Sequence, residues 1–376
     1  MLKKIMKAAL AASLVFGFSA GVHAEDFFKM YGSARMALEQ TTVTPDVGDA
    51  DTDLSLAQQG NSRFGASAQK GMVSGGFEYG TAANLRLLYA SVPMGGGSLM
   101  IGQHYVPVNI FVSNQVGGGD AGLLNYGGLY GGRRGMIQYS TGGLKVAFVA
   151  PGTPALSGVT GDADVSLPKI EAAYAMKFGN INVKAVFGTQ SGSITRAATA
   201  ATAASTTYEI DQTTGLIAGT AVAATAAGAE KSFSVSSQAL GLQAGINLGA
   251  AAVKFSYMMA TNGGNYGLWM NGGSQTAELQ NDSVVDAKSS GMLLIGSFKV
   301  SDTMGLEGGY GSLTSTAGTT GAKADGSSAM YVQLAINMGN GMTITPNYNM
   351  WDNMKDGADV KEGTVSSIGA KFQANF

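Results

Sequence analysis

The composition of this 376-residue chain does not fit an ordinary soluble domain. Glycine accounts for 56 residues and charged residues for only 13%, whereas soluble domains contain about 7% glycine and about 25% charged residues. The formal net charge of −2 argues against a nucleic-acid partner. The chain has no cysteine, which excludes disulfides and thiolate metal sites.

Residues 1–24 have the pattern of a secretory signal peptide. Three lysines form a positive n-region, residues 8–20 form an apolar core, and residues 22–24 (VHA) form a small-x-small cleavage site. The alternative, a retained membrane anchor, needs about 20 apolar residues, more than this core provides. We therefore expect cleavage and a single mature domain, 25–376. Without the three lysines the mature chain has 20 basic against 25 acidic residues, a formal charge of −5.

The mature chain alternates apolar and polar residues and has no long apolar run. In the C-terminal stretch IGAKFQANF, Ile368, Phe372 and Phe376 share one phase, while Lys371 and Gln373 take the other. No segment after the signal peptide is long and apolar enough for a transmembrane helix. The other structure that satisfies every backbone polar group in lipid is a closed barrel. The sequence therefore predicts an all-β fold, a transmembrane antiparallel β-barrel.

The charged residues of the alternating segments fall on one phase. A Lys or Arg on the lipid face at mid-membrane costs about 2–4 kcal/mol, so we expect the uncharged phase to face lipid and the charged phase to line a lumen. Besides Arg35, the charged residues that this phase assigns to the lumen are Lys29, Glu171, Lys177, Lys184, Lys254, Lys299 and Lys371.

Short turns alternate with long polar connections, which is typical of an outer-membrane barrel rather than a soluble sandwich. About 16 strands are predicted, an even number. They span 27–39, 61–70, 74–80, 84–92, 98–104, 133–140, 144–150, 168–178, 181–190, 234–248, 252–260, 289–300, 305–314, 328–338, 342–351 and 363–376. The long connections lie near 40–60, 105–132, 151–167, 191–233, 261–288 and 315–327. Pro346 inside a strand predicts a strand end or bulge, because a closed barrel has no free edge.

Two of the long connections have unusual compositions. The stretch 191–233 is rich in alanine and threonine, and we interpret it as a low-complexity extracellular loop, a buried helix being the alternative. Asp46, Asp49, Asp51 and Asp53 alternate in DVGDADTD. They could bind calcium, or form a solvated loop that bridges lipopolysaccharide through divalent ions. The glycine at the sixth position of a calcium loop is missing, and we assign no metal site.

Five stretches together resemble the Gram-negative general porins. They are MYGSARMALE, SRFGASAQKG, LRLLYASV, GSLMIGQHYVPV and the C-terminal strand that ends in Phe376. The resemblance covers most of the mature chain. It implies a homotrimer of 16-stranded, water-filled barrels in the outer membrane, through which ions and small hydrophilic solutes diffuse passively. It also implies that residues 105–132 fold into the lumen, and that the barrel-insertion machinery reads Phe376.

The resemblance further implies arginines at the narrowest point of the pore. By motif, Arg63 and Arg86 match wall arginines of the family, and the phase of Arg134 makes it the third candidate. The acidic loop motif of the family is absent, since Asp120 is the only carboxylate in 105–132. A transverse field would then be weak or completed by another loop. The alternative is that these arginines are ordinary solvated residues of the lumen wall, away from the narrowest point.

Neither catalysis nor a cofactor is expected. The mature chain retains one histidine, His104, which we interpret as pore-lining because motif matches without geometry are weak support for a catalytic triad. The arginines favour anions, whereas the acidic loops favour cations. Two other functions stay open, namely a substrate-specific channel and a structural or adhesive barrel plugged by its loops.

Overall fold

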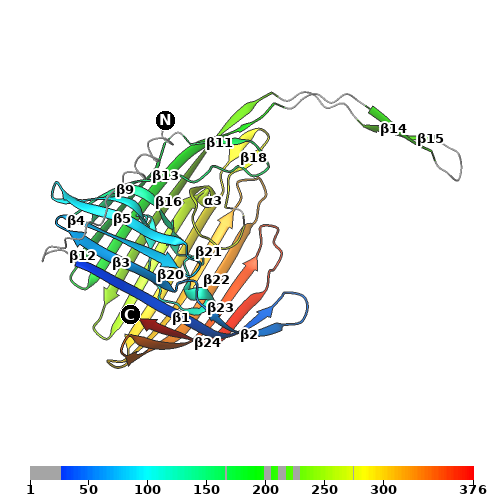
Figure 1. The fold of residues 1–376 in the computed structure, drawn as a ribbon. Helices are drawn as coiled ribbons and strands as arrows, with labels where there is room; N and C mark the ends of the chain where they lie inside the picture. The colour runs from blue at the N-terminus through cyan, green and yellow to red at the C-terminus, as the bar shows by residue number, and fades with distance from the viewer. Residues whose placement is uncertain (1–26, 166, 199–204, 211–216, 223–228, 274) are drawn as a thin grey trace.

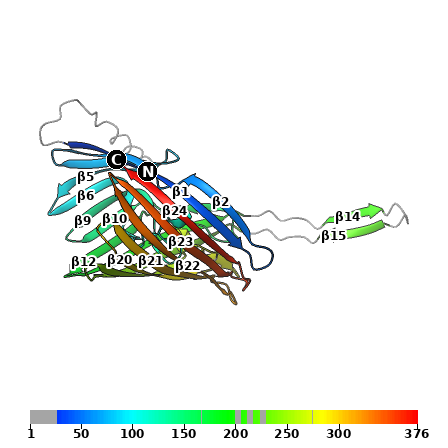
Figure 2. The ribbon, with the colours of Figure 1, turned by 90° about the horizontal axis from the view of Figure 1, so that it is seen from below.

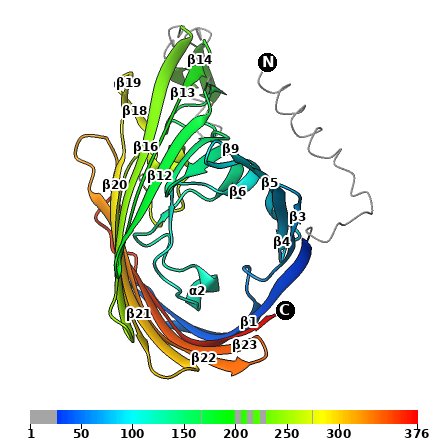
Figure 3. The same cartoon turned by 90° about the vertical axis from the view of Figure 1, so that its left-hand side faces the viewer.

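The fold is a closed antiparallel barrel, seen in a computed structural model that describes residues 27–165, 167–198, 205–210, 217–222, 229–273 and 275–376 (Figures 1 and 3). The main sheet has 18 strands and closes because β1 pairs with β24. Two of the 18, β2 (Asp51–Gln58) and β11 (Asp162–Asp164), extend the sheet beyond the ring, which leaves 16 barrel strands. The expected signal peptide, 1–24, lies outside the described residues.

The barrel strands coincide in number and order with the predicted ones. They are β1 (Phe27–Thr44), β3 (Arg63–Lys70), β4 (Val73–Gly80), β5 (Leu85–Met94), β6 (Gly97–Tyr105), β9 (Arg133–Thr141), β10 (Leu144–Val149), β12 (Lys169–Phe178), β13 (Ile181–Arg196), β16 (Lys231–Asn247), β17 (Ala251–Thr261), β20 (Lys288–Lys299), β21 (Met304–Thr316), β22 (Ala324–Gly339), β23 (Met342–Lys355) and β24 (Thr364–Asn375). The prediction of a 16-stranded barrel is confirmed.

The remaining elements lie in the connections. They are three small hairpins, β7 (Asn109–Ile110) with β8 (Leu129–Tyr130), β14 (Ser205–Ile210) with β15 (Ile217–Val222), and β18 (Glu278–Gln280) with β19 (Ser283–Val285), and the short helices α2 (Gly117–Asp120) and α3 (Gly263–Tyr266). Figures 1 and 2 show β14 and β15 standing away from the barrel. Within the described residues, no helix has both the length and the apolar character needed to cross a membrane.

The connections differ between the two ends of the barrel. At one end the strands are joined by two to four residues, as between β12 and β13 or between β20 and β21. The other end carries the long loops, with one exception, because β4 and β5 are joined there by residues 81–84 alone. We call these the turn end and the loop end.

The outer face of the barrel is apolar and exposed, as the alternation predicts. On β20, Leu294 is 51% exposed while its neighbours Leu293 and Ile295 are 0% and 1% exposed. At the turn end, Phe178 and Phe298 are 59% and 50% exposed, where an aromatic girdle of a membrane barrel lies.

Pro346 lies inside β23, neither at a strand end nor at a bulge, so that expectation was wrong. It pairs with Ala370 of β24. On its other side the ladder to β22 has the same register before and after the proline but omits Leu334 and Ala335. The missing donor is therefore accommodated by a local gap in pairing.

The chain end completes the seam between β1 and β24. The backbone N–H of Gly32 donates to the Phe376 carbonyl at 2.8 Å, and the Phe376 N–H donates to the Gly32 carbonyl at 3.1 Å. The Phe376 ring lies against Gly32, where an added Cβ would come within 2.5 Å of it. Figure 2 shows β23, β24 and β1 side by side at this seam.

Candidate pore constriction

Residues 106–132 fold into the lumen, where Figure 3 shows α2 inside the ring of strands. The loop begins with its own alternation, VPVNIFV. Val108, Ile110 and Val112 are at most 1% exposed, whereas Phe111 between them is 49% exposed. Asn109, between Val108 and Ile110, is also buried, so this segment packs on the wall and Phe111 alone is directed away from it.

The wall beneath this loop is apolar on its lumen side. Leu293, Ile295 and Leu313 belong to the same buried cluster as Val108 and Ile110 of the loop. The alternation predicts that the lumen phase carries water-compatible groups. Over β20 and β21 it does not, and the inward loop shields those side chains from water.

Buried carboxylates fix the loop to the wall. Glu171 on β12 accepts a hydrogen bond from the backbone N–H of Val108 at 2.9 Å. Glu307 on β21 accepts one from the backbone N–H of Asn114 at 2.9 Å and a second from its side-chain amide at 2.7 Å. The bond to Val108 satisfies a backbone donor that would otherwise be buried without a partner, and the two bonds to Asn114 hold an exposed part of the loop.

Three more wall residues bind loop backbone from other strands. Lys184 donates to the Asn109 carbonyl at 2.6 Å, and Lys254 to the Val112 carbonyl at 3.3 Å. The Gln333 carboxamide spans two residues, accepting from Val116 N–H at 3.0 Å and donating to the Asn114 carbonyl at 2.8 Å. Anchors on five strands from β12 to β22 thus hold the loop against one side of the lumen.

The loop tip crosses to the barrel seam through Asp120. Its carboxylate forms ion pairs with Arg35 on β1 and with Lys371 on β24, the latter at 3.1 Å. The three side chains are only 9–11% exposed. Asp120 therefore joins the loop to the two strands that close the barrel.

The tip of the inward loop lies at a gap between β2 and β3, the two strands that pair with successive parts of β1. β2 and β3 both pair with β1, at 36–43 and 27–33 respectively, so they occupy one lane interrupted at 59–62. In the break, Gln59 donates to the Val116 carbonyl at 2.9 Å, and Asn61 to the Asp120 carbonyl at 3.0 Å. These two side-chain amides, which lie between β2 and β3, therefore hold the backbone of the inward loop.

Arg63 and Arg86 converge on Glu78 of β4. The Arg86 Nε lies 2.6 Å and an Arg63 nitrogen 3.7 Å from the Glu78 carboxylate. A register shift between Glu78 and Tyr79 inserts an extra residue into β5 at this point. Bulges of this kind re-aim side chains, and this one places Arg86 beside Glu78.

Asn61 links the two ion-paired groups. Its carbonyl oxygen accepts from Arg86 at 3.3 Å while its amide donates to Asp120. We refer to the six charged residues linked in this way as the constriction ring, a name for the candidate site; they are Arg35, Arg63, Glu78, Arg86, Asp120 and Lys371. Four cations against two carboxylates give it a formal charge of +2. Even if Glu39, two lumen positions further along β1, is added, the group stays positive.

Arg134 lies apart from the constriction ring. Its guanidinium is half-buried and contacts the Gly131 carbonyl at 3.5 Å. The neighbouring Lys169 donates to the Tyr266 carbonyl at 2.6 Å, and the Tyr266 hydroxyl donates to Glu171 at 2.8 Å. Burial raises the pKa of Tyr266, as does the adjacent carboxylate, so the phenol stays protonated and able to donate. This network ties the loop containing α3 to the inward loop.

Three of the charged residues assigned to the lumen lie at the turn end. Lys29, Lys177 and Lys299 are exposed near the ends of β1, β12 and β20. Lys299 pairs with Asp302 of the adjacent turn at 2.6 Å. These lysines are not part of the constriction ring.

The sequence reasoning missed Glu78 and Asn61. The family resemblance implies an acidic partner for Arg63 and Arg86 on the inward loop, whereas Glu78 is on the barrel wall. It is the only charged residue of VSGGFEYG, in a region where the alternation was too short to define phase. Asn61 directly precedes Ser62-Arg63, yet nothing in its pattern distinguishes it from an ordinary loop residue.

His104 lines the lumen side of β6, with its ring 4.8 Å from that of Tyr89. Among the described residues, the His104 side chain has no hydrogen bond to a serine or carboxylate.

No group of three His, Cys, Asp or Glu residues in the described part of the chain could hold a metal ion. Asp46 is one of the aspartates considered for calcium, and its Oδ1 lies 3.8 Å from the Nζ of Lys361.

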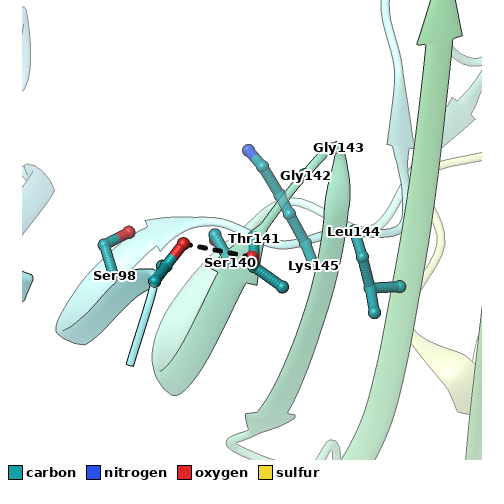
Figure 4. A pocket seen from close by; sticks show the side chains of 9 residues that line it. Ser98, Ser140, Thr141, Gly142, Gly143, Leu144 and Lys145 are labelled. Atoms are coloured by element: carbon teal, nitrogen blue, oxygen red, sulfur yellow. Dashed lines mark hydrogen bonds between the residues drawn. The ribbon is translucent and has the colours of Figure 1, made fainter. Parts of the chain in front are cut away.

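A small surface pocket lies elsewhere, at the turn end (Figure 4). Its volume is about 310 Å³, and it lies between the β5–β6 and β9–β10 turns. The Thr141 hydroxyl donates to the Gly96 carbonyl across it at 3.3 Å. The lining is largely turn backbone, with no charged group other than Lys145, so we assign it no role.

No protein-family model and no curated protein matches the chain. Solved structures do match. The outer membrane channel DcaP of Acinetobacter baumannii superposes with a TM-score of 0.65 at 14% identity, covering 95% of this chain and 100% of that one. An anion-selective porin from Comamonas acidovorans gives 0.58 at 14% identity, covering 94% and 100%. The trimer form of OmpT from Vibrio cholerae gives 0.54 at 14% identity, covering 93% and 99%. The chain has the fold of the outer-membrane porins, as the sequence resemblance predicted.

Proposed function

We propose that this protein is an outer-membrane diffusion channel with a preference for anions. Ions and small hydrophilic solutes would pass the constriction ring in water, without catalysis and without a cofactor. The observation that carries the proposal is the ring itself, in which four cations face two carboxylates beside an inward loop that has a single acidic residue.

The electrostatic argument rests on position. Charges that line a narrow, low-dielectric passage act more strongly on a passing ion than charges in bulk water. Asp120 and Glu78 are each shared between two cations, so neither offers a free carboxylate to a passing cation. The net field at the ring therefore favours anions.

The outer-membrane location is supported by the lipid-compatible outer face and by the signal-peptide pattern. Lipid and lipopolysaccharide would surround the barrel, and Phe376, paired at the seam, would be read by the insertion machinery. We also propose a homotrimer, because OmpT of Vibrio cholerae, which has this fold, occurs in a trimer form. A folded, unheated sample that migrates at monomer mass in a denaturing gel would contradict the trimer.

Liposome swelling with neutral sugars of increasing size tests the diffusion channel. We expect rates that fall smoothly with solute size and rise linearly with concentration. Saturation by one sugar would favour a substrate-specific channel instead. Liposomes that contain folded protein but do not swell with any sugar would indicate a barrel plugged by its loops.

A further inference from the structure

Six aromatic side chains form a continuous series beside the constriction ring. Adjacent rings meet edge to face, with centroid distances of 4.8 to 6.5 Å. We call them the aromatic run, and its members are Tyr89, His104, Tyr105, Phe111, Tyr130 and Trp269.

The run leads from the loop end into the barrel. Trp269 follows α3, and its backbone N–H donates to the Tyr130 carbonyl of the inward loop at 3.1 Å. Tyr105 ends β6 at the loop end, and His104 is one residue deeper. Tyr89 on β5 pairs with Gly102, three residues below Tyr105. Four separate segments thus contribute rings to one path.

Two rings of the run are half exposed, although each contacts at least one neighbouring ring. Phe111 and Trp269 are 49% and 46% exposed. The neighbours Ile110 and Val112 of Phe111 are buried against the wall, so the phenylalanine occupies the pore-facing phase where a polar residue would be better solvated. Exposed apolar surface in a concave, water-filled site is typical of a place that receives a ligand.

An unneutralised cation lies against the run. The Arg133 Cζ is 5.4 Å from the centroid of the Tyr105 ring, and the Tyr105 hydroxyl lies 3.4 Å from Arg133 and 3.3 Å from Arg86. Arg86 is buried and paired with Glu78. Across the described part of the chain, by contrast, no carboxylate lies within 4 Å of Arg133. Arg133 therefore has its charge available.

We propose that the aromatic run and Arg133 form a binding subsite for aromatic carboxylates. The flat ring of the solute lies against Phe111 and Trp269 in the edge-to-face or offset geometry that aromatic pairs prefer. Its carboxylate meets the Arg133 guanidinium, which can bind it with two hydrogen bonds. This inference rests on the proposed channel function and adds a solute class to it. Binding is weak, since conduction requires that a solute also leave the site.

Binding can be measured without any ion flow because the chain has two tryptophans. In a Trp351→Phe variant the remaining tryptophan, Trp269, reports on the run. Titration of the folded protein in detergent with benzoate should change its fluorescence saturably. Cyclohexanecarboxylate, which has the charge but not the flat ring, should bind about three- to tenfold more weakly, and acetate should give no saturable change.

Substitutions separate the ring from the charge. On the Trp351→Phe background, Phe111→Leu keeps an apolar side chain but removes the ring, and should weaken benzoate binding about three- to tenfold. Arg133→Gln should weaken benzoate and cyclohexanecarboxylate alike. Phe148→Leu is the matched control, since Phe148 is 54% exposed on the lipid face, and should have no effect.

Planar-bilayer recording then separates this inference from the proposed function. We expect benzoate to reduce chloride current saturably in the wild-type channel and more weakly in Phe111→Leu. Normal chloride current with no saturable fluorescence change would overturn the subsite and leave the channel intact. Saturable fluorescence in a protein that conducts no ions would overturn the channel and leave the subsite. Equal binding of benzoate and cyclohexanecarboxylate would overturn the role of the rings.

Discussion

Replacing Asp120 by asparagine removes the single carboxylate of the inward loop from the constriction ring. The side chain keeps its size and can still accept a hydrogen bond, but Arg35 and Lys371 lose their counter-charge. The formal charge of the ring rises from +2 to +3. We predict that the substitution increases the preference of the channel for anions.

The size of the effect follows from Coulomb's law. Two unit charges about 5 Å apart interact by about 0.8 kcal/mol in water, which is about a fourfold change in the occupancy of a passing ion. Chloride would gain and potassium would lose by this factor, so the unscreened ratio would change about sixteenfold. Salt at about 0.1 M has a screening length of about 10 Å and weakens the interaction at about 5 Å by roughly 40%. The ratio of chloride to potassium permeability should therefore rise about three- to tenfold in Asp120→Asn.

The same substitution also loosens the loop tip. Arg35 and Lys371 are largely buried, and removing the partner of a buried ion pair typically costs about 3–5 kcal/mol. The wall anchors Glu171, Glu307 and Gln333 remain, so we expect displacement of the tip rather than release of the loop. Single-channel conductance should increase.

Glu78→Gln is the matched control for Asp120→Asn. It removes the same charge from the wall, between Arg63 and Arg86, without touching the loop. The zero-current potential in a potassium chloride gradient should shift in the same direction in both variants, while conductance rises only in Asp120→Asn. An unchanged zero-current potential in Asp120→Asn would refute the electrostatic reasoning.

Three further substitutions test the loop anchor, the seam and the lipid face. Glu307→Ala removes the acceptor of two hydrogen bonds from Asn114, each worth about 1.5–3 kcal/mol because the acceptor is charged, and should increase open-channel current noise. Noise equal to that of the wild type would contradict the anchor. Gly32→Val forces a Cβ against the Phe376 ring and should reduce the yield of heat-resistant barrel, whereas Gly296→Val, which meets nothing within 4 Å, should not. Leu294→Arg places a charge on the lipid face and should lower the free energy of unfolding in lipid vesicles by about 2–4 kcal/mol, and equal stability would mean that this face is not in lipid.

The barrel could be predicted because lipid constrains every strand in the same way. A lipid-facing position excludes charge, so the alternation survives along β1, β12 and β24 and defines phase from local sequence alone. Strand number and order followed from this. The prediction failed at Pro346, because a proline can remain inside a strand where one neighbour leaves a gap in the ladder.

The constriction ring could be predicted only in part, because its contacts join residues far apart in the chain. Asp120 and Lys371 are separated by 251 positions, and Asn61 and Asp120 by 59. Arg63 and Arg86 were identified by motif, whereas Glu78 was hidden by the bulge that aligns it with Arg86. The apolar lumen face of β20 left a signal, MLLI, which is apolar on both phases, but what covers it depends on how the loop packs.

The anion preference of the open channel is tested most directly by the zero-current potential of the purified wild-type protein in a planar bilayer, under a potassium chloride gradient. We predict steady, non-saturating conductance and a potential whose sign reports chloride as the more permeant ion. A potential that favours potassium would mean that the acidic loops, not the constriction ring, control passage. Protein that is folded yet silent would contradict the channel itself.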